Sequence, residues 1–436
     1  MSTHHHIEQA RAGCALHGAL AAFGAIEGVT PVIHATAGCG IQYERGVTPF
    51  GGALPPCAAW GPPVSSTNIS EKHVVFGGGS RLREQLKNTV KVVAADLYAV
   101  VSSCATEMVG DDLQAMTKEG REQGFPVICA NTPGFRGSLH VGYETAVKAL
   151  IEQLPAAAPN GNATPRRLIN LWGIIPQQDP FWQGHLLQLT QLIHSLGWEA
   201  NVLFGTGQTV KAWQEVPAAA LNVVLSPWGE KTARSLQEKH QTPWVSFAGL
   251  PVGPKAIERF LKTLAERLGA EHNPSAFRAQ ERALDAWLAR LAPGYFQNGW
   301  QREFAIVGEF SLVHGLTEFL TETLGLLPKL VVVTDPLSEE QQQQWLPQLE
   351  SLVKPWSAKI VVQEDAGEIA ELIERSGAEL VLGSSLEREV ADRLGVPLLP
   401  VSFPVAGRLI LNRGYVGFDG ALTLLEDLGT ALLQAS

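Results

Sequence analysis

The chain has 436 residues, of which 45% are hydrophobic, and its formal net charge is −10 at pH 7. This length allows two to four domains with separate cores, and an acidic chain without clustered Lys and Arg is not expected to bind nucleic acid. No apolar run approaches the roughly 18 residues that span a bilayer, and the N-terminus has no signal-peptide pattern. We therefore expect a cytoplasmic protein that makes no membrane contact.

Short apolar runs alternate with helical patterns in the first third of the chain. Residues 30–35, 96–101 and 125–130 are strand-like, and "VVFGGG" (74–79) is typical of a strand or tight turn before an amphipathic helix. Its glycines lack the G-x-G-x-x-G spacing and the lysine of phosphate loops. Strands that alternate with helices predict βαβ units and a parallel sheet.

The same alternation continues after a Pro- and Ala-rich linker at 154–165. A long helix is expected from Phe181, a bridging helix at 281–293, and a third unit from Phe304 with four strands that are apolar on both faces. Such strands belong to parallel sheets between helices. We predict an α/β fold of three Rossmann-like domains with parallel sheets flanked by helices, bounded as 1–160, 166–295 and 300–436.

All five cysteines fall in the first third of the chain: Cys14, Cys39, Cys57, Cys104 and Cys129. An odd number without a secretion signal argues against a disulfide framework and favours redox or metal chemistry. Cys39 and Cys104 each follow a predicted strand, and Cys14 follows Gly13. Glycines next to a cysteine allow backbone amides to approach an inorganic cluster. The first domain is therefore expected to carry the chemistry.

Other interpretations of the cysteines stay open. Structural zinc needs four ligands at short spacing, whereas the three candidate thiols are separated by 25 and 65 residues. A nucleophilic cysteine needs a base, for which His17, His34 and His73 are candidates. Packing alone explains Cys57 and Cys129 best. Three thiols at strand ends also suit an iron–sulfur site, but three thiolates are too few, so the missing ligands would come from another chain.

The stretch "SCATEMVGDD" (103–112) contains two adjacent carboxylates after Cys104. We expect Thr106 or Asp111 to cap the following helix and Asp112 to lie in its first turn, so the carboxylates need no catalytic role. The short tract from His4 to His6 is interpreted as a solvated tail rather than a metal site.

Longer blocks resemble the component-one proteins of nitrogenase and nitrogenase-like reductases, and specifically their β-type subunits. The resemblance runs nearly end to end. It includes "IHATAGCG" (33–40), "VVFGGGSRLREQLKN" (74–88), "SSCATEMVGDDL" (102–113), "NTPGFRGSLHVGY" (131–143) and "RGYVGFDGALTLLEDL" (413–428).

The resemblance implies that Cys14, Cys39 and Cys104 are the β-side ligands of a P-cluster-type iron–sulfur cluster, 8Fe-7S or related to 4Fe-4S. It implies that an α-type subunit supplies the other ligands in an α2β2 heterotetramer. An ATP-dependent, homodimeric iron-protein reductase would supply electrons singly. A larger catalytic iron–sulfur cofactor is expected in the partner, because this chain has no late cysteine to bind a second cluster.

Several positions depart from the molybdenum nitrogenase pattern. Gly134 replaces a serine that can join the oxidised cluster, Ala35 replaces the usual glycine, and the stretch 46–68, which contains Cys57, is dissimilar. Cys57 is therefore also a candidate replacement ligand. These departures favour a nitrogenase-like enzyme, and the best fit is the β-type subunit of methylthio-alkane reductase, which cleaves C–S bonds reductively.

Three alternatives are carried forward. The chain could be a dinitrogenase β subunit, or a scaffold subunit for nitrogenase cofactor assembly, although β-type scaffold chains commonly lack part of the three-cysteine set. A metal-free Rossmann-type transferase would share the alternating strands and helices, since fold alone does not settle function. The transferase interpretation leaves the cysteines unexplained.

Overall fold

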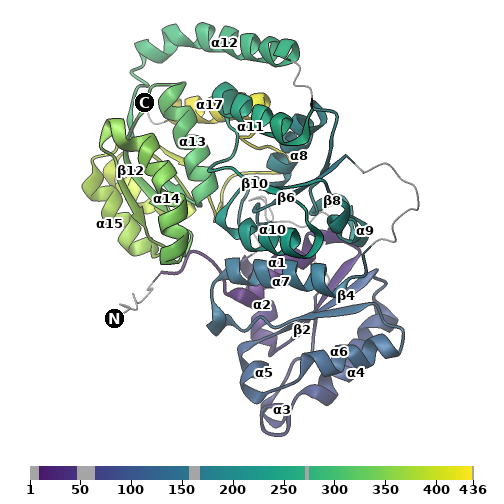
Figure 1. The fold of residues 1–436 in the computed structure, drawn as a ribbon. Coiled ribbons are helices and arrows are strands. Elements are labelled where there is room, and N and C mark those ends of the chain that lie inside the picture. Colours follow the sequence, from purple (N-terminus) through teal and green to yellow (C-terminus); the bar gives the residue numbers. More distant parts are fainter. Residues whose placement is uncertain (1–8, 47–63, 157–166, 271–273, 435–436) are drawn as a thin grey trace.

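Three parallel β-sheets covered by helices organise the chain, as Figure 1 shows for this computed structural model. The structure describes residues 9–46, 64–156, 167–270 and 274–434. Within them every strand pairing that joins two named strands is parallel. The predicted α/β fold class is thereby confirmed, while the predicted domain boundaries stay a prediction.

The first sheet has the strand order β3-β2-β4-β5. Its elements are α1 (Ala15–Gly24), β1 (Ile26–Glu27), β2 (Val29–His34), α2 (Ala37–Gly46), β3 (Ser65–Ser66), α3 (Glu71–Phe76), α4 (Gly79–Val92), β4 (Leu97–Ser102), α5 (Cys104–Val109), α6 (Leu113–Glu122), β5 (Val127–Ala130), the 3-10 turn η1 (Gly134–Arg136) and α7 (Leu139–Gln153). Alternate residues of β4 pack on opposite faces, Ala99 and Val101 in the core with α1 and α7, and Tyr98 and Val100 with α4 and α6. Helices on both faces explain why this strand is buried at every position.

The second sheet has the order β10-β9-β6-β7. Its region contains β6 (Leu168–Trp172), α8 (Trp182–His194), β7 (Glu199–Asn201), β8 (Gly205–Thr209), α9 (Val210–Gln214), η2 (Val216–Ala218), β9 (Leu221–Val224), α10 (Pro227–His240), β10 (Trp244–Ser246), α11 (Gly253–Leu268) and α12 (Pro274–Gln297). The short β1 and β8 pair with each other, so the first and second regions share a two-stranded sheet.

The third sheet has the order β13-β12-β11-β14-β15. Its region contains β11 (Glu303–Gly308), α13 (Phe310–Glu322), β12 (Leu327–Val333), α14 (Glu339–Val353), η3 (Lys354–Trp356), β13 (Lys359–Val362), α15 (Ala366–Ser376), β14 (Leu380–Gly383), η4 (Ser385–Glu387), α16 (Arg388–Leu394), β15 (Leu398–Pro400) and α17 (Gly417–Gln434). The last helix, α17, returns to the second region and packs against α8, α11 and α12 (Figure 1).

Two local expectations differ from the structure. Residues 74–76 lie in helix α3 rather than in a strand, because Ser70 and His73 form a reciprocal cap at its start, and Gly77 ends it with a φ of +88°. The bridging helix is longer than 281–293, since α12 covers Pro274–Gln297. In the described part of the chain, no helix is both long and apolar enough to cross a membrane.

Candidate functional site

The three predicted cysteines come together at one edge of the first sheet. Cys39 lies in the first turn of α2 and Cys104 is the first residue of α5. These helices follow β2 and β4, which pair in parallel with His34 opposite Ser102, so both begin at the same sheet edge. Cys14 is the N-cap residue of α1.

Gly134, in the turn η1, lies between two of the thiols. A Cβ atom built on Gly134 would lie 3.2 Å from Cys104 Sγ and 3.3 Å from Cys14 Sγ. The backbone N–H of Gly134 donates a hydrogen bond to Cys104 Sγ, with an N to S distance of 3.1 Å. The missing side chain therefore leaves open the space that the two sulfur atoms face.

Electrostatics links the third thiol to the other two. Burial raises the pKa of the Cys39 thiol; a hydrogen bond with Thr36 lowers it, and the nearby Cys14 and Cys104 raise it further. Thiolates this close to one another repel unless a cation compensates them, and metal coordination deprotonates a thiol outright. The donor set therefore fits a soft, positively charged metal group.

Exposure separates these thiols from the remaining cysteines. Cys14 and Cys39 are half-buried, Cys104 is exposed, and Cys129 is buried. Cys129 lies in β5 and accepts a hydrogen bond from Thr117 at 3.3 Å, as expected for a packed thiol. The three-cysteine site thus opens to the surface of this chain. Cys57 and the tract His4 to His6 lie outside the described residues.

A close helix crossing positions Cys14. A Cβ atom on Gly18 of α1 would lie 1.8 Å from the carbonyl oxygen of Leu139, and one on Gly142 of α7 would lie 1.8 Å from that of Ala15. The N–H of Leu139 also donates to the carbonyl of Gly13 at 2.8 Å. Backbone contact between α1 and α7 therefore fixes Cys14 beside the turn that carries Gly134.

The capping expectation for "SCATEMVGDD" was right only in part. Ser103 is the N-cap of α5, and Thr106 completes the capping box by accepting the N–H of Ser103 at 3.0 Å. The hydroxyl of Thr106 also donates to the carbonyl oxygen of His34 at 3.0 Å. Gly110 ends α5 in a left-handed conformation, with a φ of +82°, so Asp112 starts a second helix as the N-cap of α6. The interruption by Gly110 explains why one continuous helix does not form.

Asp111 has a structural role, as expected for these carboxylates. Its Oδ2 lies 2.9 Å from His34 Nε2, and both of its oxygens accept the N–H of Gly78. His34 Nδ1 also lies 3.1 Å from Thr67 Oγ1, and burial lowers the pKa of His34 although Asp111 opposes this. This network joins the end of β2 to the turn before α4.

The three histidines considered as bases have other partners. His34 is bonded to Asp111 and Thr67, His73 bonds Ser70 in the cap of α3, and the ring of His17 hydrogen-bonds the backbone of Cys39. These contacts favour structural roles over activation of a cysteine nucleophile.

Two further features of the site were missed from the sequence. A cavity of about 440 Å³ adjoins Cys14, and its lining includes Arg11, His17, Tyr43 and Phe403. Exposed apolar side chains also occur on the elements that carry Cys39, Cys104 and Gly134: Ile41 of α2, Met108 of α5 and Phe135 of η1. Only the assembled fold could show the cavity, because its lining comes from distant parts of the chain.

The sequence is similar to that of a known protein family over nearly the whole chain. A family model described as "Nitrogenase component 1 type Oxidoreductase" matches residues 14–433. The nitrogenase molybdenum-iron protein beta chain of Bradyrhizobium diazoefficiens is 25% identical over 446 residues, which cover 95% of this chain and 82% of that protein. The nitrogenase vanadium-iron protein beta chain of Trichormus variabilis is 27% identical over 407 residues, which cover 85% of this chain and 83% of that protein.

Structural similarity extends over the whole chain. The solved structure "Nitrogenase Cp1 at pH 6.5" matches with a TM-score of 0.81 at 21% identity, and the match covers 100% of this chain and 95% of that one. The fold is thus that of the nitrogenase component-one proteins. Together with the family match over residues 14–433, this shows that the chain belongs to the nitrogenase component 1 type oxidoreductase family.

Proposed function

We propose that this chain is the β-type subunit of a nitrogenase-like reductase and that Cys14, Cys39 and Cys104 hold one side of a P-cluster-type iron–sulfur cluster. The observation that carries this proposal is the grouping of three free thiols from three elements, in which Gly134 adjoins Cys14 and Cys104, and both of these thiols act electrostatically on Cys39. Soft thiolate ligands favour iron–sulfur clusters over hard cations. Similarity to molybdenum and vanadium nitrogenase beta chains supports the subunit type.

The residues around the thiols suit such a ligand set. When bound, a cluster of this kind supplies one-electron transfer. The N–H of Gly134 donates to Cys104 Sγ, and hydrogen bonds to ligand sulfur are one of the ways in which a protein sets a reduction potential. Gly134 also leaves space beside Cys14 that a side chain would take.

An α-type partner would complete the site. Three thiolates are too few for a cluster of this size, and Cys104 is exposed, so further ligands can approach from outside this chain. Ile41, Met108 and Phe135 are 52%, 80% and 61% exposed, and apolar side chains left in water near a site favour protein contact. We propose an α2β2 heterotetramer, served by an ATP-dependent homodimeric iron protein, with the larger catalytic cofactor in the α-type subunit.

For the reaction, we propose reductive cleavage of C–S bonds in methylthio-alkanes. The support is the departure of Gly134, Ala35 and the stretch 46–68 from the molybdenum nitrogenase pattern. Reduction of dinitrogen is the second candidate, because the relatives reported above are nitrogenase beta chains. A role as a scaffold for cofactor assembly is disfavoured by the complete three-cysteine set.

Iron content and electron paramagnetic resonance of the anaerobically purified complex test the cluster assignment. Cys104→Ala is expected to lose iron and the cluster signal, because it removes one of three ligands from this chain. Cys129→Ala is the matched control, since that thiol is packed in β5 and is expected to leave iron content unchanged. Because Cys104 is exposed, the variant should fold, which thermal unfolding checks. Equal iron in wild type and Cys104→Ala would refute the proposal.

A substrate comparison tests the reaction separately. The complex is supplied with its iron protein and ATP, and then with either dinitrogen or dimethyl sulfide. Methane and methanethiol from dimethyl sulfide, without ammonia from dinitrogen, are the expected products. Ammonia as the main product would favour the dinitrogenase alternative, while leaving the cluster assignment intact.

A further inference from the structure

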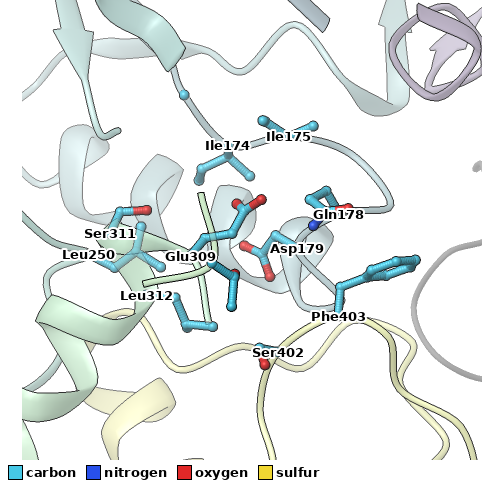
Figure 2. Close-up of a pocket in the computed structure, with 12 residues that line it drawn as sticks. Ile174, Ile175, Gln178, Asp179, Leu250, Glu309, Ser311, Leu312, Ser402 and Phe403 are labelled. Carbon is cyan, nitrogen blue, oxygen red and sulfur yellow. The ribbon is translucent and has the colours of Figure 1, made fainter. Parts of the chain in front are cut away.

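A second group of side chains that could bind a metal lies where the three regions meet. Figure 2 shows the crevice, with Ile174 and Ile175 after β6, Glu309 after β11, and Ser402 after β15. It encloses a cavity of about 10 Å³, close to the space that one water molecule needs. In open α/β sheets, ligands bind beyond the carboxyl ends of the strands, and this crevice has that position.

One imidazole and two carboxylates converge beside this cavity. Single ligand atoms of His140, Glu309 and Asp335 lie within 4.8 Å of one another. His140 comes from the first turn of α7, Glu309 from the start of α13, and Asp335 from the loop after β12. His140 Nε2 and Glu309 Oε1 are 2.7 Å apart. The first region therefore supplies His140, and the third region supplies both carboxylates.

The second region contributes through a neighbouring residue. Trp228 of α10 donates from its Nε1 to Asp335 Oδ1 at 2.6 Å, and the N–H of Phe310 donates to Asp335 Oδ2 at 2.5 Å. Each carboxylate oxygen has two lone pairs, so these bonds fix the orientation of Asp335 and leave it able to bind a cation. Hydrogen bonds that orient a ligand in this way are typical of metal sites.

Negative charge exceeds positive charge around this imidazole. Glu309, Asp335 and Glu364 all act on His140, whereas the further carboxylate of Glu144 is paired with Lys231. A buried group with this excess of carboxylates needs protons or a cation to balance it.

An unpaired polar atom lies in the same cavity lining. Gln178 is 5% exposed, and within the described residues its Oε1 has no hydrogen-bond partner. Buried polar atoms are normally satisfied by protein or by ordered water. A water molecule bound to an ion at Glu309 would fit this cavity and could donate a hydrogen bond to Gln178 Oε1.

We propose that His140, Glu309 and Asp335 bind one divalent first-row transition metal ion, at a site separate from the three cysteines. Mixed imidazole and carboxylate donors suit Mn²⁺, Fe²⁺ or Zn²⁺. Binding of the ion would release the proton of the His140–Glu309 hydrogen bond to solvent, and these two ligand atoms would move from 2.7 Å to about 3 Å apart, as bonds of roughly 2.1 Å require. The adjoining cavity gives Glu309 room for this shift.

Mn²⁺ is the test probe because it prefers oxygen and nitrogen donors to thiolates. The purified complex is first assayed for its metal content and then titrated with Mn²⁺, with free Mn²⁺ followed by electron paramagnetic resonance at room temperature. At a free Mn²⁺ concentration near the wild-type dissociation constant, the sum of metal already present and Mn²⁺ taken up is expected to be lower in Glu309→Gln, because the loss of a ligand should weaken Mn²⁺ binding by roughly tenfold or more.

Two control variants isolate this site. His34→Gln removes the imidazole of another buried histidine–carboxylate pair, in which His34 Nε2 lies 2.9 Å from Asp111 Oδ2 and neither residue lines this cavity. Neither His34→Gln nor Cys104→Ala is expected to change Mn²⁺ uptake. Mn²⁺ should also raise the thermal midpoint of wild type and His34→Gln, but not that of Glu309→Gln.

Two results would overturn the proposal. The first is wild-type protein with neither resident metal beyond the cluster iron nor saturable Mn²⁺ uptake. The second is equal uptake by wild type and Glu309→Gln. If Glu309→Gln does not fold, His140→Gln is used in its place. The wild-type titration alone still tests whether the protein takes up Mn²⁺ saturably.

Discussion

Gly134 contributes to the cysteine site by having no side chain. A Cβ atom at this position would lie 3.1 Å from Cys14 Cβ, so a serine would require its neighbours to move by a few tenths of an ångström. The backbone N–H remains directed at Cys104 Sγ. At this position the chain therefore presents a backbone N–H and open space to the cysteine site, but no side-chain oxygen.

His314 of α13 gives a pH-dependent prediction at the scale of one residue. Burial lowers its pKa to about 4, although Glu318 opposes this, and Arg259 lowers it further. An unfolded histidine titrates near 6.5. The pKa of His314 is lower in the folded state than in the unfolded state. The neutral side chain therefore makes its full contribution to the free energy of unfolding above about pH 6.5, and this contribution is lost as the pH falls towards 4.

We expect wild type to lose roughly 3 kcal/mol through this group between those pH values. His314→Leu removes the titration, so the urea midpoint of the variant should fall less than that of wild type between pH 7 and about pH 4.5. His194→Leu, at an exposed histidine of α8, is the control and should follow wild type. Parallel pH profiles for wild type and His314→Leu would contradict the prediction.

The crossing of α1 and α7 gives a prediction at the scale of elements. Gly18→Ala would place a methyl group 1.8 Å from the carbonyl oxygen of Leu139, so the helices must separate. Overpacking of this kind typically costs about 1–3 kcal/mol or more. We expect a lower thermal midpoint and, because α1 begins just after Cys14, a lower iron content of the complex.

Gly294→Ala is the matched control for this crossing. Gly294 lies inside α12, and no atom is within 4 Å of a Cβ built there. Alanine is the better helix former by roughly 1 kcal/mol, so this variant should be as stable as wild type or more so. A Gly18→Ala protein that unfolds at the wild-type temperature would show that the two helices can separate without cost.

Sequence patterns predicted those elements that bury their apolar residues. The strands β2, β4 and β14 are buried at every position, and their apolar runs had predicted them. Helix α3 was misassigned because its residues Val74, Val75 and Phe76 are apolar but 48%, 73% and 86% exposed. Strand β8 gave no signal, since Gly205–Thr209 contains two glycines and no apolar side chain.

Long-range contacts set the limit for predicting the sites. The three cysteines could be proposed from sequence because each stands at the start of an element. The backbone contact of Gly18 with Leu139 could not be proposed, because a small residue in a helix carries no sign of its partner. His140 and Glu309 are 169 positions apart, so no local spacing joins them.

At the scale of the whole molecule, a buried ion pair ties the segment before Cys14 to the third region. Arg11 donates to both carboxylate oxygens of Glu387, at 2.7 and 2.9 Å, and to Ser384 Oγ at 2.8 Å. The side chains of Arg11 and Glu387 are 3% and 1% exposed. Removing one partner of such a pair leaves a buried, uncompensated charge.

We therefore expect Arg11→Ala to lower the free energy of unfolding by about 3–5 kcal/mol, as measured by urea denaturation. Arg393→Ala breaks ion pairs with Glu374 and Glu389 on the surface and should leave the urea midpoint unchanged. Replacing both buried partners, as Arg11→Met with Glu387→Met, should recover part of the loss, because neither variant residue leaves a charge behind. If Arg11→Ala were as stable as Arg393→Ala, the pair would not hold the N-terminal segment against the third region.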